Sequence, residues 1–200
     1  MFAVLLLTTL LAAADPQADQ APTPQPEDLA QAGNYKAALE GFRQRVAADP
    51  GDLDARVWIA RLHERMGRPD LAEPVYRGVV LEAPGHVDAA IGLANLLTKQ
   101  RHDSEAVRVL ERAKGAEPRN PNLLAALGSA YLGVSNAKLA LAYLELAAAL
   151  SPTPENVNAL KRARRRTGAR RHVPQTSSAR AAETRHARRG HGAEVTAPWR

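Results

Sequence analysis

The sequence predicts an all-α protein in which helical hairpins stack into a solenoid. Prolines recur every 34 residues, at Pro50, Pro84, Pro118 and Pro152, which indicates an internal repeat. Alanine makes up 40 of the 200 residues and aromatic residues only 8, a bias that favours close packing of helices over a β-sandwich. Between the prolines, apolar residues recur at spacings of three and four, as on one face of an α-helix.

Apolar positions follow the same period. Small residues recur at Ala38, Ala72, Ala106 and Ala140, larger ones four positions later at Phe42, Tyr76, Leu110 and Leu144, and a further series at Ile59-Ala60, Leu93-Ala94 and Leu127-Gly128. We expect the small residues to lie where the helices of one hairpin approach closely, and the larger ones to fill the space between units. A single unit cannot bury its apolar face, so at least about three must stack.

One full unit runs from Leu53 to His86. Its pattern predicts a helix, a turn at Gly67-Arg68-Pro69, and a second helix that ends before Pro84-Gly85. Asp70 followed by Glu73 predicts a capping box at the start of that second helix.

Two residues depart from the repeat. Arg45 stands where later units have Val79, Ala113 and Ala147, and His63 stands where they have Leu97 and Tyr131. The first unit is also shortened, because only PEDLAQAG precedes its second helix. We therefore expect looser packing in the early units, with His63 packed between helices.

The repeated series resemble those of the tetratricopeptide repeat family, over about residues 27 to 166. The resemblance implies a right-handed superhelix in which the first helix of each unit lines a concave groove. In that family the groove holds an extended or helical peptide, so the expected partner is a protein or peptide.

Carried over position by position, the resemblance places these residues in the groove: Asp54, Val57, Arg61, Glu64, Arg65, Asp88, Ile91, Asn95, Thr98, Lys99, Asn122 and Ser129. Arg61, Arg65, Asn95 and Lys99 are suited to accept a carboxylate or an acidic side chain. A plain solvated helix face is the alternative. The positions of the family's carboxylate clamp hold Val57, Arg61, Gly92, Asn122 and Ala126, so an adaptor for chaperone tails is not supported.

The chain divides by composition. We predict a signal peptide at 1–14, a Pro- and Gln-rich linker at 15–26, a solenoid at 27–152, a polar capping helix at 153–166 and a disordered basic tail at 167–200. The solenoid's units are 27–52, 53–86, 87–120 and 121–152.

The amino terminus carries an uncharged apolar run at 2–14 that closes on Ala12-Ala13-Ala14, a fit to an A-x-A cleavage site. Thirteen helical residues rise about 20 Å, which is short of a bilayer core. The run therefore favours a cleaved export signal. An uncleaved anchor or a buried amphipathic helix are the alternatives, since no Lys or Arg precedes the run.

Charge is divided unevenly along the chain. Residues 161–200 hold 12 Lys and Arg against 2 acids, whereas the rest holds 15 against 19. The basic end is suited to an anionic surface through salt-dependent attraction, or it serves only to solvate the chain. Nucleic acid is out of reach if the protein is exported.

The sequence offers no catalytic, cofactor or metal motif. There is no cysteine, and no P-loop, G-x-S-x-G, H-E-x-x-H or G-x-G-x-x-G is present. His86 and His102 fall in turns, where solvation is expected, and His172, His186 and His191 lie in the tail with no nearby acid cluster. We therefore predict a protein that is not an enzyme.

Together these features predict a non-catalytic scaffold for protein–protein interaction, exported to the periplasm or cell envelope, that helps to assemble or maintain a complex there. The alternative is an intracellular protein, in the cytoplasm, that binds nucleic acid or another polyanion through its basic C-terminal tail. Neither the partner nor the oligomeric state is encoded in a recognisable motif.

Overall fold

The computed structural model describes residues 24–168, and this range forms nine α-helices and no strand. They are α1 (Pro26–Gln31), α2 (Tyr35–Ala48), α3 (Leu53–Arg65), α4 (Pro69–Glu82), α5 (Val87–Lys99), α6 (Asp103–Lys114), α7 (Pro121–Gly133), α8 (Ala137–Leu150) and α9 (Pro154–Thr167). The predicted all-α solenoid of helical hairpins is confirmed. The predicted signal peptide, nearly all of the linker and the tail beyond residue 168 lie outside the described residues.

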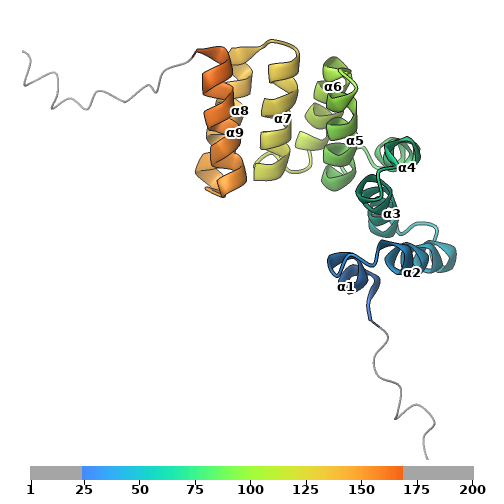
Figure 1. Ribbon diagram of the computed structural model, residues 1–200. Helices are drawn as coiled ribbons and strands as arrows, with labels where there is room; N and C mark the ends of the chain where they lie inside the picture. The colour runs from blue at the N-terminus through green and yellow to red at the C-terminus, as the bar shows by residue number, and fades with distance from the viewer. Residues whose placement is uncertain (1–23, 169–200) are drawn as a thin grey trace, which may run out of the picture.

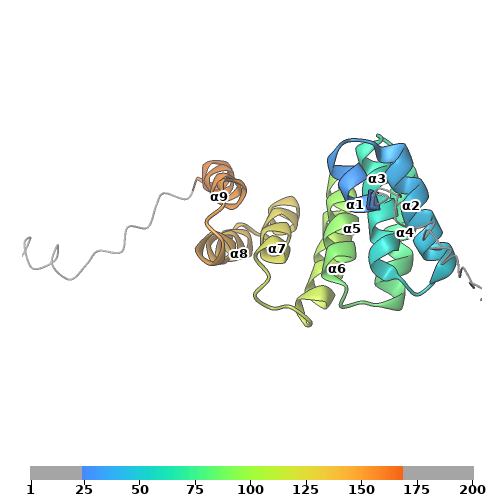
Figure 2. The same cartoon turned by 90° about the horizontal axis from the view of Figure 1, so that it is seen from below.

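The hairpins stack in chain order, and their direction turns along the stack. In Figure 1, α7 and α9 stand upright while α2 lies across the view, and in Figure 2 α7 and α9 are seen nearly end-on while α3 to α6 stand roughly upright. Each of α3, α5 and α7 contacts the next odd-numbered helix, whereas the even-numbered helices make no comparable contact with one another. The odd-numbered helices therefore form the inner, concave side, and the even-numbered ones the outer, convex side.

The periodic residues build the core, as the sequence predicts. Those exposed by 1% or less are Ala38, Ala72, Ala106, Ala140, Phe42, Tyr76, Leu110 and Leu144. Glycine occurs where two helices approach most closely: a Cβ on Gly128 would lie 2.5 Å from Cγ of Leu144, and one on Gly92 would lie 2.4 Å from Cζ of Tyr76. A side chain at either position would push the helices apart.

The turn inside each hairpin contains one residue in the left-handed region. These residues are again 34 apart: Gly33, Gly67, Arg101 and Ser135, with φ of 80°, 73°, 67° and 62°. Glycine takes this conformation without steric cost, but a residue with a Cβ does not. The two later hairpins therefore keep the turn at some cost in energy.

The second helix of the second unit, α4, begins differently from the expected capping box. α4 starts at Pro69, whose fixed φ suits a first helical position, and the preceding Arg68 makes no side-chain cap. Asp70 therefore lies inside the helix and cannot cap it, so the capping-box prediction is wrong. The carboxylate of Glu73 instead accepts a 2.7 Å hydrogen bond from Gln100 of the next unit.

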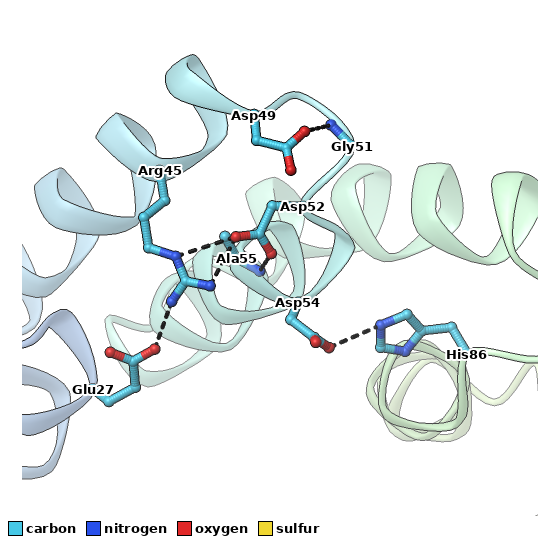
Figure 3. A network of polar contacts seen from close by, with 8 residues as sticks. All are labelled: Glu27, Arg45, Asp49, Gly51, Asp52, Asp54, Ala55 and His86. Atoms are coloured by element: carbon cyan, nitrogen blue, oxygen red, sulfur yellow. Dashed lines mark hydrogen bonds and ion pairs between the residues drawn. The ribbon is translucent and has the colours of Figure 1, made fainter.

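Arg45 compensates for the shortened first unit. Its side chain does not enter the core as the aliphatic residues one and two periods later do, but lies at the surface and pairs with Glu27 of α1 at 2.7 Å and Asp52 at 2.8 Å (Figure 3). The backbone amide of Ala55 and the Arg45 guanidinium lower the pKa of the Asp52 carboxyl. The expected looseness at Arg45 is replaced by ion pairs that join α1 and α2 to the start of α3.

His63 is buried between the helices of the early units, with 7% of its surface exposed. Its Nδ1 has no hydrogen-bond partner among the described residues. Burial, reinforced by the nearby Arg43 and Arg68 and opposed by Asp70, lowers the pKa of His63. The imidazole therefore packs as a neutral group in a position that is aliphatic or aromatic in later units.

Candidate functional site

Most of the predicted groove residues are accessible at the surface of the protein. Those that are exposed are Asp54, Arg65, Asp88, Asn95, Lys99, Asn122 and Ser129, and those that are half-buried are Arg61, Glu64, Ile91 and Thr98. Val57 is only 2% exposed and belongs to the core, so it presents no surface to a partner. The groove has an N-terminal half, between α3 and α5, and a C-terminal half, across α5, α7 and α9.

In the N-terminal half, the charged side chains pair with one another. The Arg61 guanidinium lies 3.0 Å from the Asp88 carboxylate, which reaches it from the next unit. Lys99 lies 3.5 Å from Glu64. An arriving carboxylate would have to share these cations with Asp88 and Glu64, which already neutralise part of their charge.

Glu64 is held in place from beneath as well. It accepts a 3.0 Å hydrogen bond from the hydroxyl of Tyr76, a core residue of α4. Burial and the neighbouring Glu64 raise the pKa of Tyr76, so the hydroxyl stays a neutral donor. The ring of Tyr76 in turn fits because Gly92 leaves room for it.

The remaining charged groups at this end are also engaged. Arg65 donates a 3.4 Å hydrogen bond to the Ala30 carbonyl and lies over the Tyr35 ring. His86, which was expected to be solvated, accepts a hydrogen bond from the Ala89 amide through Nδ1 and approaches Asp54 to 3.2 Å through Nε2 (Figure 3). The solvation expected for His86 is therefore wrong.

The C-terminal half has different chemistry at the same repeat positions. One period after Arg61 and Asp88 stand Asn95 and Asn122. Both are exposed, and within residues 24–168 neither side chain makes a hydrogen bond. Their amides can donate and accept, so they are available to the backbone of a peptide.

These residues line a hollow of about 440 Å³ on the concave side of α5, α7 and α9. Its lining consists of Ile91, Asn95, Asn122, Ala125, Ala126, Ser129, Glu155, Asn156, Ala159 and Arg162. The volume lies within the range of roughly 300–1,000 Å³ typical of ligand sites. Six of these ten residues are polar or charged and the other four are Ile91 and three alanines, so the lining is more polar than that of a usual small-molecule pocket.

The contribution of α9 was missed by the sequence analysis, which predicted only a cap. The positions 34 residues after Asn122 and Ala125 are Asn156 and Ala159, so the period could have found these two. It could not have found Arg162, because the residue 34 positions before it is the buried Gly128. Gly128 is covered by α8, the second helix of its own hairpin. Within the described residues no helix follows α9, so Arg162 stays exposed.

The comparisons with known proteins agree with this architecture. The family model of the tetratricopeptide repeat matches residues 29–77 and 65–130, which together are just over half of the chain. The chain belongs to the tetratricopeptide repeat family. Such repeats form scaffolds for protein–protein interaction, and the fold is typical of proteins without catalytic activity. The predicted family and the coarse function are thereby confirmed.

Two curated relatives contain a similar region. Protein FlbA of Caulobacter vibrioides is 28% identical over 60% of this chain and 20% of its own length. Cellulose synthase operon protein C of Pseudomonas fluorescens is 30% identical over 66% of this chain and 11% of its own length. The chain thus spans a fifth or less of these relatives, which share the repeat with it.

Two solved structures share the fold. TTC0263, a thermophilic tetratricopeptide repeat protein of Thermus thermophilus, has a TM-score of 0.64 at 23% identity and covers 80% of this chain and 94% of its own. YrrB, described as having an unusual peptide-binding site, has a TM-score of 0.56 at 18% identity, over 68% of this chain and 71% of its own. At these identities the likeness concerns the fold alone.

Among residues 24–168, no group of three or more His, Cys, Asp or Glu residues is arranged to hold a metal ion. Within that range, too, no helix combines the length and apolar character needed to span a bilayer.

Proposed function

We propose that this tetratricopeptide repeat protein binds a peptide segment of another protein in the C-terminal half of its groove. The observation that carries the proposal is the pair Asn95 and Asn122, whose side-chain amides face the hollow without a partner within the described residues. The peptide-binding site named for YrrB supports a peptide ligand. Binding to free amides displaces only water, whereas a charged ligand at the N-terminal half must compete with the ion pairs already formed there.

The proposal is tested by exchanging residues between equivalent positions of neighbouring repeats. The double substitution Asn95→Arg and Asn122→Asp copies the Arg61–Asp88 pair into the C-terminal half and should close the hollow. Proteins cross-linked to the wild type in its native cells should be lost from this variant, while its helicity measured by circular dichroism stays unchanged. Retention of the same proteins would contradict the proposal.

A matched control variant changes the N-terminal half of the groove instead. Arg61→Asn with Asp88→Asn removes the ion pair and installs the two amides one period earlier. This variant should keep every partner of the wild type, because the C-terminal half is untouched. The pair is partly exposed, so its loss should cost less than about 1 kcal/mol of stability.

The proposed setting is the cell envelope, where the scaffold would help to assemble or maintain a complex. The apolar run at 2–14 supports export, and the name of the cellulose synthase operon relative is compatible with a role at the cell surface. Cell fractionation followed by amino-terminal sequencing tests this. A periplasmic protein beginning near Asp15 is expected, and an intact Met1 in the cytosol would contradict it.

A second function is favoured by the exposed face of α9. Lys161, Arg165 and Arg166 are exposed there and have no ion-pair partner within the described residues. They start the basic segment 161–200, which would bind a polyanion through counterion release. Binding to heparin or DNA should weaken steeply with salt and vanish when 161–200 is deleted; binding that survives the deletion would exclude this function.

A further inference from the structure

Two charged residues of α9 stand at opposite edges of the hollow. Glu155 and Arg162 both line it, and neither makes an ion pair within the described residues. They are seven residues apart on one helix, so they lie on nearly the same face and are separated by about 10 Å along the axis. The hollow therefore has a free negative charge at one edge and a free positive charge at the other.

The neighbouring helices extend this arrangement. α5, α7 and α9 run in the same direction, because one antiparallel helix separates each from the next. Asn122 and Glu155 lie one residue after the start of their helices, whereas Asn95, Ser129 and Arg162 lie eight residues after it. Ile91 lies between the two edges and gives the hollow an apolar centre.

We infer that the hollow selects a peptide segment with an acidic side chain facing Arg162, a basic side chain facing Glu155 and an apolar residue between the two edges. The inference rests on the proposed function and specifies the ligand's chemistry. A segment lying extended along the groove side of α9 covers about 10 Å in three residues, so one segment can place an acidic side chain at Arg162 and a basic one at Glu155, with an apolar residue between them. The uncharged amides of Asn95 and Asn122 are left for its backbone.

The paired charges in the N-terminal half support this assignment. Arg61 and Lys99 are already neutralised by Asp88 and Glu64, so they add little to the recognition of a charged ligand. Arg162 is the cation of the groove that lines the hollow. An acidic ligand residue thus has one unpaired guanidinium available at this site, and the bond it forms is charge-assisted.

The inference is tested by selecting peptides from a random phage-displayed library, first on the wild type and then on the charge-swapped variant Glu155→Arg with Arg162→Glu. The wild type should enrich peptides with one order of acidic and basic residues around an apolar residue. The swapped variant should enrich the reverse order. The same order on both proteins, or peptides without charge, would overturn the inference and leave the proposed function standing.

A single substitution tests the same point without the swap. Arg162→Ala should weaken binding of a selected synthetic peptide by about fivefold, as expected for a partly exposed ion pair. Arg165→Ala is the matched control, since Arg165 is an exposed arginine of α9 outside the hollow, and it should leave the affinity unchanged. Equal effects of the two substitutions would overturn the inference. Failure of both library selections would count against the proposed function as well.

Discussion

The two halves of the groove use the same repeat positions for opposite purposes. Arg61 and Asp88 meet at 3.0 Å between α3 and α5, whereas Asn95 and Asn122, one period later, stay apart and open to solvent between α5 and α7. Arginine is long enough to reach across the gap between neighbouring units, and asparagine is not. The length and charge of two side chains thus decide whether the groove between two neighbouring units is occupied by an ion pair or open to a ligand.

The closed half depends on core packing as well as on surface charge. Tyr76 reaches Glu64 from the core, and it can do so only because Gly92 leaves space for its ring. The equivalent pair one period later is Leu110 with Ala126, which packs without a hydroxyl. The core residue at this position therefore affects the groove: the hydroxyl of Tyr76 holds the carboxylate of Glu64, whereas Leu110 can hold no polar group.

The largest expected effect comes from removing that space. Gly92→Ala would place a Cβ 2.4 Å from Cζ of Tyr76, and this overpacking should lower the free energy of unfolding by about 2 kcal/mol. Urea unfolding followed by circular dichroism measures it. Adding Tyr76→Leu recreates the Leu110–Ala126 pair and should recover most of the loss. An undisturbed Gly92→Ala protein would show that the two halves do not differ in packing.

The next effect concerns His63, which has no counterpart in the later units. Because its pKa is lowered in the folded protein from the ordinary value of 6.5, the unfolded chain binds the proton more readily, and stability falls as the pH drops below about 6.5. His63→Leu, the residue found at position 97, should remove this dependence. It should also add about 1 kcal/mol, since Nδ1 is buried without a partner.

Urea midpoints at about pH 7.5 and about pH 5.5 measure both consequences, and the window lies on either side of the ordinary histidine pKa. If the wild type and His63→Leu lost stability equally on acidification, the pH sensitivity would lie elsewhere in the chain.

The smallest effect distinguishes the turns of the early and late hairpins. Arg101→Gly removes a Cβ from a residue with a φ of 67° and should stabilise the protein by about 0.5 kcal/mol, the steric relief being partly offset by the entropy of glycine. Gly67→Ala makes the reverse change at the equivalent turn and should destabilise. Thermal midpoints of the two variants should therefore move in opposite directions.

Much of the fold could be predicted from the sequence because the same pattern of small and large residues recurs in each repeat. Burial of Ala72 and Tyr76 and the turn at Gly67 follow from spacing alone. The capping box at Asp70 was wrong because the helix already starts at Pro69, which places Asp70 inside it. The positions of the groove residues could be predicted from the family resemblance, but whether their charges are paired could not. Arg61 and Asp88 belong to different units and meet only after these units stack.

By itself, the sequence determined the repeat, its period and the residues that are buried, because small and large residues recur at fixed spacing. Which helices face inward was expected only from the resemblance to the tetratricopeptide repeat family. Only the tertiary structure decided where a partner can bind. Ion pairs between units close the groove near Arg61, and the absence of a helix packed over α9 in the described residues leaves Arg162 in the hollow. Both depend on distances between units that no single repeat contains.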